Sequence, residues 1–403
     1  MPTSQADSNL KPSKPYPTFP LTAHANGQWC KKIRGKVHFF GVWADPKAAL
    51  DKYTRQAANL HAGRKPRLYS EDGATIKTIA NHYLAAQLEK ANRDLITPAS
   101  FNDCLYAIKA FVRAIGGERP LGDVGPEDFG KYRLHLYDRL GVCAIERSIT
   151  IIRSMFTHAY EADMVDQPMK YGGQFDKPTQ KEKRQNRTEH DRAYGKRLFT
   201  AKEIWALLNE ANPQLKAMIL LGINGGFGNT DCAELPVQAV NLKQRVIDYD
   251  RPKTAVQRVV PLWPETTEAL KKVLNGERPK ARRPEYEQLV FLTTFGNSWT
   301  QEMVRTREPD QPPKVSRQSA VVLEFGKLLK RLDMKQQGRG FYALRHTFRT
   351  WADETHDQHA VHRIMGHTIP GMSGIYIEEV GLPRLRAVVN HVRKKLFSHR
   401  QSR

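Results

Sequence analysis

The chain of 403 residues has few cysteines and no long apolar run. Its four cysteines, Cys30, Cys104, Cys143 and Cys232, are far apart and form no CxxC pair, a pattern that argues against a disulfide framework or a zinc site. No segment approaches the roughly 18 apolar residues that a membrane-spanning helix needs, and the first residues lack the basic start and apolar run of a signal peptide. We therefore expect a protein of the reducing cytoplasm, with no membrane partner, metal or cofactor.

Acidic residues are also scarce relative to basic ones. The chain has 42 Asp and Glu against 64 Lys and Arg, which gives a formal net charge of +22 and a sequence pI near 9.8. Such a field attracts polyanions, and the excess is clustered rather than uniform, so nucleic acid is the expected partner. The alternatives are a protein kept soluble by its charge, a ribosomal protein or a membrane-surface binder. At this length we expect two or three domains.

The N-terminal part changes character near residue 26. Residues 1–25 contain five prolines and no periodicity, and they predict a disordered arm. Residues 26–68 predict a small basic module, with strands at 28–34 and 37–43 and a helix from Asp45-Pro46 to about His61. Two-stranded ribbons can enter a major groove. This predicts DNA contacts by four basic residues, Lys31, Lys32, Arg34 and Lys36, although an ordinary β-rich cap fits the same pattern.

The remainder predicts mainly helices, in two further domains. Residues 72–175 carry four amphipathic segments, among them a face of Phe101, Leu105 and Ile108 after a Ser100 cap. Residues 176–197 are charged and predict a basic linker. Residues 198–397 predict an α+β domain that opens with a capping box of Thr200 and Glu203, and residues 398–403 form a tail. The strand candidates of the α+β domain lie at 245–249 and 257–262, and its later helix candidates lie at 320–332, 343–355, 359–365 and 384–397.

The chemistry of the chain concentrates near its C-terminus. The stretch Leu344-Arg345-His346-Thr347-Phe348-Arg349-Thr350 is followed by Met365-Gly366-His367 and then by Tyr376. The planar guanidinium of arginine binds an anionic phosphate with two parallel donors, and a tyrosine hydroxyl can be a nucleophile that becomes covalently joined to its substrate. This arrangement resembles the C-terminal active-site motif of tyrosine recombinases, the phage integrase family.

The resemblance assigns roles to the motif residues. It implies that Tyr376 is the nucleophile, that Arg345 is the family's second catalytic arginine, and that His367 donates a hydrogen bond to the same phosphate. Tyr342 stands where the family usually has a histidine that accepts the proton of the nucleophile. His346 and Arg349 are expected to be structural or DNA-facing neighbours on the same helix.

A second resemblance lies in the segment from Arg251 to Leu262, which is similar to the family's β-hairpin. It implies that Lys253 is the general acid that protonates the leaving 5′-oxygen, and we expect Arg258 to contact DNA. Residues 26–68 are similar to the arm-binding modules of many integrases, and residues 72–175 to the helical core-binding domain that grips double-stranded DNA. The helix at 384–397 implies a homotetramer coupled by docking into a neighbouring protomer, with packing in the same chain or DNA binding as alternatives.

One part of the family pattern is missing. The first catalytic arginine normally lies three residues before a Glu-Leu pair, and Glu234-Leu235 places Asp231 there, with no Arg or Lys from Leu221 to Asn241. An aspartate facing phosphate would repel it unless turned away or paired, and Asn229 or Thr230 could supply neutral hydrogen bonds instead. We therefore expect a site-specific, nucleoid-associated recombinase that forms a 3′-phosphotyrosyl intermediate. The alternatives are a weakened or inactive accessory DNA-binding protein and, third, a relative of type IB topoisomerases.

Overall fold

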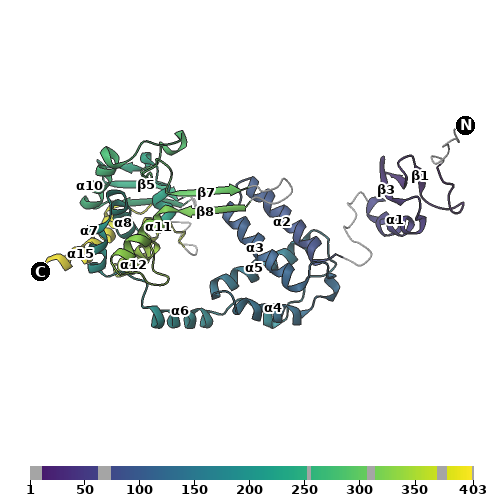
Figure 1. Cartoon of the computed structure of the whole chain (residues 1–403), viewed down its shortest axis with the longest axis horizontal. Helices are drawn as coiled ribbons and strands as arrows, with labels where there is room; N and C mark the ends of the chain where they lie inside the picture. Colours follow the sequence, from purple (N-terminus) through teal and green to yellow (C-terminus); the bar gives the residue numbers. More distant parts are fainter. Residues whose placement is uncertain (1–10, 62–73, 252–255, 306–313, 370–378, 402–403) are drawn as a thin grey trace, which may run out of the picture. The chain divides into compact units, whose positions relative to one another are not determined.

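The computed structural model describes residues 11–61, 74–251, 256–305, 314–369 and 379–401. They form two compact units, which divide between Pro178 and Thr179 (Figure 1). The first unit contains the N-terminal module and a helical bundle, and the second contains the α+β domain. Each part is described by itself below.

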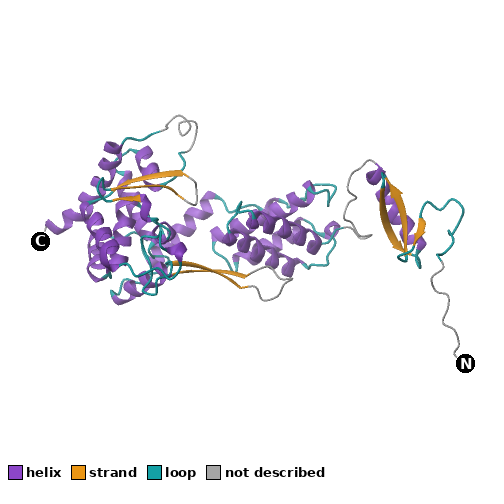
Figure 2. Cartoon of the chain, turned by 90° about the horizontal axis from the view of Figure 1, so that it is seen from above, coloured by secondary structure: helices purple, strands orange, loops and turns teal. Residues whose placement is uncertain are grey.

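The N-terminal module is a three-stranded antiparallel sheet with one helix against it (Figure 2). Its elements are β1 (Thr22–His24), β2 (Gln28–Ile33), β3 (Lys36–Val42) and α1 (Pro46–His61). The hairpin and the helix match the sequence prediction. The predicted arm is wrong for the residues nearest the sheet, because Phe19 and Leu21 are buried beside Trp29 and β1 pairs with β2. Burial of these two apolar side chains in the core of the module fixes the end of the proline-rich segment against the sheet.

The helical bundle consists of α2 (Ile76–Asn92), α3 (Pro98–Ile115), α4 (Pro126–Tyr137) and α5 (Val142–Glu161), with short 3-10 turns at η1 (Leu121–Asp123) and η2 (Gly173–Phe175). All four expected helices are present. Their apolar faces meet in one core, in which Phe111, Phe129 and Phe156 are in mutual ring contact. The cap of α3 is Thr97 rather than Ser100, since the Thr97 hydroxyl accepts from the Ser100 amide.

Most of the expected linker is a helix, α6 (Gln180–Tyr194). None of the side chains of this helix is buried. Thr179 and Glu182 form a capping box at its start. Straight-chain charged residues have high helix propensity, so the composition that indicated a solvated connector also stabilises a solvated helix. Most of the segment predicted as a linker is therefore helical, and its side chains are not buried.

The α+β domain is built around α8 (Pro213–Gly225), eleven residues of which are buried. The predicted capping box of Thr200 and Glu203 is present at α7. The strands β4, β5 and β6 form one antiparallel sheet in that order, and β7 and β8 form a separate ribbon. The elements are α7 (Ala201–Glu210), α9 (Asn229–Ala233), η3 (Val237–Ala239), β4 (Val240–Asn241), β5 (Val246–Arg251), β6 (Val256–Pro261), α10 (Pro264–Lys272), η4 (Val273–Glu277), η5 (Pro284–Tyr286), β7 (Thr300–Arg305), β8 (Lys314–Ser319), α11 (Ala320–Arg331), α12 (Tyr342–Asp353), α13 (Gln358–Met365) and α15 (Leu382–Gln401).

The C-terminal helix α15 packs within its own chain. Its apolar face, formed by Leu385, Val388, Val389, Val392 and Leu396, is buried in the core of the domain. The indole Nε1 of Trp263 donates to the Val389 carbonyl at 2.8 Å, and Nε1 of Trp205 donates to the Leu396 carbonyl at 3.0 Å. Of the alternatives that the sequence left open for this helix, the structure shows packing in the same chain, so this face is not free to dock into a neighbour.

Candidate functional site

Two of the predicted site residues come together where the first turn of α12 meets the C-terminal end of α13. Arg345 on α12 is 2% exposed and donates to the Gly226 carbonyl, to the Met365 carbonyl at 3.0 Å and to Nε2 of His367 at 2.5 Å. Gly366, with a φ of 60°, ends α13 in the left-handed conformation and turns the chain toward Arg345. Because arginine only donates, Nε2 of His367 is the acceptor here, and its imidazole is neutral.

Asp231, at the position of the missing arginine, is surrounded by arginines. Its Oδ2 accepts from the Gly228 amide at 2.8 Å, which caps α9. Its Oδ1 accepts from Nε of Arg251 at 3.2 Å, and Nη1 of Arg258 lies 3.3 Å from Oδ2. Nη1 of Arg345 lies 3.6 Å from the same oxygen. The carboxylate is therefore both turned inward and paired, as an aspartate near phosphate must be.

We call Asp231, Arg251, Arg258 and Arg345 the arginine cluster. All four are buried, and three guanidiniums share one carboxylate, so these groups carry a net positive charge. A buried charge without a counterion is costly. The cluster is therefore suited to receive an anion.

The electrostatics of these groups follow from their burial and mutual repulsion. Burial, followed by the charge of Arg258, lowers the pKa of Arg345 to about 10, so it is still protonated at neutral pH. Burial works to raise the pKa of Asp231, but Arg258 and Arg251 outweigh it and hold the pKa below its ordinary value. Burial, followed by Arg345, lowers the pKa of His367 to about 4. At neutral pH the positive charge of the site thus lies on its arginines.

The expected contact of Arg258 with DNA does not fit its position. The side chain is 0% exposed, with Nε donating to the Ile364 carbonyl at 2.9 Å and Nη2 to the Gly225 carbonyl at 2.6 Å. Its guanidinium carbon lies 3.5 Å from the centre of the Phe227 ring. Arg258 is a buried structural residue, because the side of β6 that carries it faces the core and not the solvent.

The other predicted residues of α12 lie at or near the surface. Tyr342 is 47% exposed, contacts the His346 ring edge-on at 5.3 Å and packs on Gly228 of the α9 turn. Partial burial and the nearby Arg187 lower the pKa of His346. Arg349 donates to Asp353 and to Gln358, both at 2.6 Å. Tyr342 thus lies beside the cluster, and the DNA-facing roles of His346 and Arg349 remain predictions.

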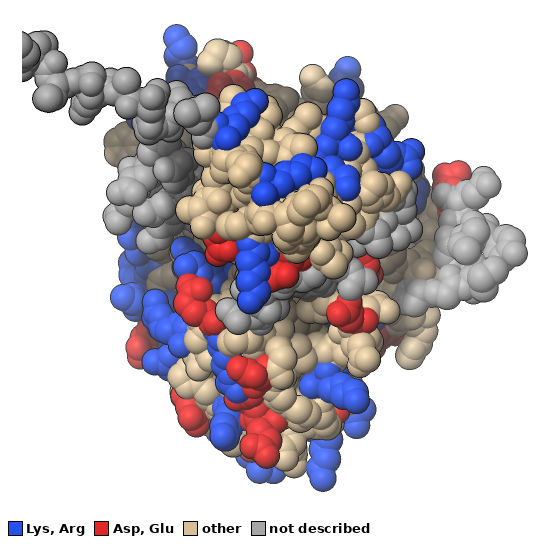
Figure 3. All heavy atoms as spheres, turned by 90° about the vertical axis from the view of Figure 1, so that its right-hand side faces the viewer, with Lys and Arg blue, Asp and Glu red and all other residues tan. Residues whose placement is uncertain are grey.

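Lys253 and Tyr376 lie outside the described residues, so their roles also remain predictions. In the N-terminal module, Lys32, Arg34 and Lys36 are exposed on the β2–β3 hairpin, and Nζ of Lys31 lies 4.7 Å from the centre of the Tyr53 ring. Figure 3 shows Lys and Arg side chains spread over the visible face, with acidic groups among them.

Neither a metal site nor a membrane span is found in the part of the chain that the structure describes. No group of three or more His, Cys, Asp or Glu side chains there could hold a metal ion. The described helices are each too short or too polar to span a bilayer.

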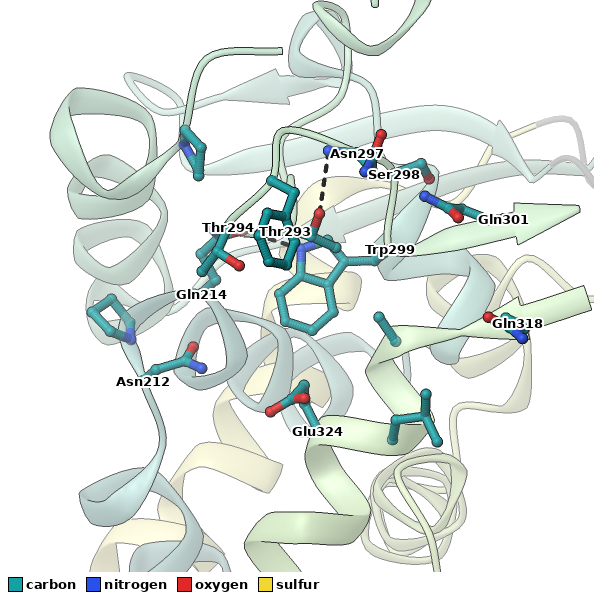
Figure 4. A pocket seen from close by; sticks show the side chains of 15 residues that line it. Asn212, Gln214, Thr293, Thr294, Asn297, Ser298, Trp299, Gln301, Gln318 and Glu324 are labelled. Carbon is teal, nitrogen blue, oxygen red and sulfur yellow. Dashed lines mark hydrogen bonds between the residues drawn. The ribbon is translucent and has the colours of Figure 1, made fainter. Parts of the chain in front are cut away.

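A pocket of about 580 Å³ lies elsewhere in the domain, between the start of α8, the 293–299 loop and α11 (Figure 4). Gln214 braces its wall, since its Oε1 accepts from Nε1 of Trp299 at 3.3 Å and from the Leu292 amide at 3.1 Å. Among the described residues that line it, there is one carboxylate, Glu324, and no histidine, cysteine, lysine or arginine. These residues offer a single carboxylate and no cationic side chain to bind an anion, so the arginine cluster remains the candidate site.

Sequence reasoning missed Arg251 as a site residue. It directly precedes Pro252 and Lys253 in the segment that is similar to the family's β-hairpin. The signal that could have revealed it was Asp231, which has no Arg or Lys near it in the sequence, because a buried carboxylate needs a cationic partner.

Comparisons with known proteins bear on the family and the fold of the chain. The model of the phage integrase family matches residues 197–380. The Tn1549 transposon integrase, solved with circular intermediate DNA, is 16% identical, with a TM-score of 0.54 over 78% of this chain and 99% of that one. The lambda integrase dimer bound to a COC′ core site is 15% identical, with a TM-score of 0.54 over 92% of this chain and 98% of that one. The lambda integrase tetramer bound to a Holliday junction is 14% identical, with a TM-score of 0.53 over 92% and 99%. No curated protein matches the chain. At these identities the solved structures establish a shared fold.

Proposed function

We propose that this chain, a member of the phage integrase family by its match to the family model over residues 197–380, is a site-specific DNA recombinase or integrase. Its substrate would be double-stranded DNA, which it cuts and rejoins through a covalent 3′-phosphotyrosyl intermediate. The observation that carries the proposal is the meeting of Arg345 and His367 in a buried cluster with excess positive charge. A scissile phosphodiester would supply the missing anion.

The proposed step uses residues of the motif. The phenol oxygen of Tyr376 forms a bond to phosphorus while the bond from phosphorus to the 5′-oxygen breaks. The phenol loses its proton, and the leaving oxygen gains one, which we assign to Lys253 as general acid. Arg345 and His367 would hold the non-bridging oxygens and offset the charge of the pentacoordinate transition state. The phosphotyrosyl bond conserves the energy of the broken one, so rejoining needs no ATP and no metal.

Lambda integrase has been solved as a tetramer on a Holliday junction, and we propose a homotetramer on paired sites for this chain as well. The apolar face of α15 is already buried in its own domain. Coupling between protomers through this helix would therefore need exposed residues of α15, or an exchange of the whole helix between chains.

The test is capture of the covalent adduct. Duplexes that bind the Tyr376→Phe protein are first selected from a random pool, since that variant would bind without cutting. Nicked versions, which lose the fragment behind the cut, are then incubated with the wild type and resolved in denaturing gels. We expect an adduct with the wild type and with Tyr160→Phe, which alters an exposed tyrosine of α5, and none with Tyr376→Phe.

One observation favours a second function. Asp231 replaces the family's first arginine, and losing a transition-state contact of this kind typically costs a few kcal/mol, which is orders of magnitude in rate. A chain weakened in this way would be an accessory DNA-binding protein. Salt-sensitive binding to the selected duplexes, with no adduct from the wild type on any of them, would establish that function instead.

A further inference from the structure

We propose that Arg251 replaces the missing first arginine as a catalytic residue that contacts the scissile phosphate, and that Asp231 is the positioning residue that holds it. In this view the guanidinium has moved from the α9 turn to the end of strand β5. The inference rests on the proposed function, and it deepens it by completing the active site.

The position of Arg251 is the first argument. Its Cδ would lie 2.9 Å from a Cβ added at Gly366, so its side chain runs directly along the residue that precedes His367. Its charge contributes to the lowered pKa of both Arg345 and His367. Arg251 therefore lies beside the turn at Gly366 that leads into His367, and its charge acts on both residues that the family motif identifies as phosphate ligands.

The donors left on Arg251 are the second argument. Among the described residues, the one hydrogen bond of its side chain runs from Nε to Oδ1 of Asp231 at 3.2 Å. A carboxylate on Nε fixes the plane of the guanidinium and leaves Nη1 and Nη2 to donate, the pair that can bind a phosphate in parallel. Arg251 also keeps 8% of its surface exposed.

Arg258 cannot take this role. It is 0% exposed and spends donors on the Ile364 and Gly225 carbonyls. It already supplies Asp231 with a counterion at 3.3 Å. An ion pair that served structure alone would be complete with Asp231 and Arg258, and the burial of a further guanidinium beside them indicates an anion that binds later.

The role of Asp231 follows from the same geometry. Three guanidiniums within a few ångströms repel one another, and the shared carboxylate offsets part of that repulsion. It lies inside the α9 turn, bound to the Gly228 amide, and so keeps its charge away from an approaching phosphate. An aspartate that would repel the substrate if it faced outward thus becomes the anchor of a relocated arginine.

The experiment compares single-turnover adduct formation on the nicked duplexes. Arg251→Gln should slow the adduct by about 10²–10³-fold, the usual effect of removing one such donor, and leave noncovalent DNA binding within a few-fold of wild type. Arg245→Gln, an exposed arginine just before the same strand, should leave the rate unchanged. Tryptophan fluorescence checks folding, and should Arg251→Gln unfold, Arg251→Lys, which retains a charge for Asp231, takes its place in the comparison.

Two readouts separate a catalytic role from a structural one. On a duplex with an uncharged methylphosphonate at the cut, the penalty of Arg251→Gln should shrink to less than about tenfold, because the charge it binds is gone. If Asp231 acts through Arg251, Asp231→Asn combined with Arg251→Gln should be no slower than Arg251→Gln alone, whereas independent roles would multiply.

Two results would overturn the inference while the proposed function stands: an adduct from Arg251→Gln at the wild-type rate, or an equal penalty on phosphate and methylphosphonate. Absence of any adduct from the wild type would overturn the proposed function, and this inference with it.

Discussion

Replacing Arg258 with methionine tests whether the arginine cluster is buried as described. Methionine keeps the unbranched side chain but removes the charge and all donors. The carbonyls of Gly225 and Ile364 lose their hydrogen bonds, and Asp231 loses the counterion nearest Oδ2. Because Arg258 is on the strand that the sequence assigned to DNA contact, the same variant also distinguishes the two interpretations.

The magnitude follows from those contacts. Breaking a buried ion pair from one side costs about 3–5 kcal/mol, and a buried carbonyl left without a donor costs about 1–3 kcal/mol. These terms overlap, and Asp231 retains Arg251 as a partner. We therefore expect a loss of about 4 kcal/mol in the free energy of unfolding. With a urea slope of about 2–3 kcal/mol/M, this lowers the midpoint by about 1.3–2 M.

The assay is urea unfolding of the full chain, followed by tryptophan fluorescence. Trp205, Trp263, Trp299 and Trp351 all lie in the second unit, and the bundle of α2–α5 contains no tryptophan. The control is Arg245→Met, an exposed arginine that should change stability by less than about 0.5 kcal/mol. An Arg258→Met protein as stable as this control, but with weakened DNA binding, would refute the buried placement and restore the surface role.

Three further predictions concern other parts of the chain. His367→Gln should remove a pH dependence of stability. The pKa of His367 is held at about 4, below its ordinary value of 6.5, so between these pH values the folded state binds fewer protons than the unfolded state. The free energy of unfolding of the wild type, measured in urea, should therefore fall relative to that of the variant as the pH drops from about 6.5 to about 4. The opposite trend would mean that this histidine is charged in the folded protein. Val392→Asp should destabilise the domain by more than about 3 kcal/mol in the same assay, because the α15 face is buried in its own chain. A stable variant that fails only to assemble, as seen by ultracentrifugation, would show that this face docks between protomers. Lys32→Ala and Lys36→Ala should each reduce the slope of log K against log salt for DNA binding by about one, and unchanged slopes would remove the N-terminal hairpin from the interface.

Much of the fold could be predicted because its signals are local. The helix at α7 begins where Thr200 and Glu203 form a capping box, and the bundle helices follow apolar residues at helical spacing. The proximity of Arg345 and His367 was also implied by the sequence, since the resemblance to the family assigned both residues to the same phosphate. Local patterns were ambiguous for α6, because its charged residues suit a solvated helix as well as an irregular connector.

The arginine cluster could not be predicted in the same way. Alternation along β6 places Arg258 on the same side as the buried Val260, but a buried arginine is expected only where its partners are known. Those partners, Asp231 and the carbonyls of Gly225 and Ile364, come from α9, α8 and α13. Nothing in the spacing of these segments reveals that they meet.

The sequence by itself determined the family motif, the positions of most helices and the absence of an arginine at position 231. The tertiary structure decided that Asp231 meets Arg251, 20 residues away, that Arg258 is sealed in the core, and that α15 fills its own domain. The physical reason is the distance along the sequence over which each signal acts. Caps and periodicities depend on residues within one or two turns, whereas the environment of a buried charge depends on elements that only folding brings together.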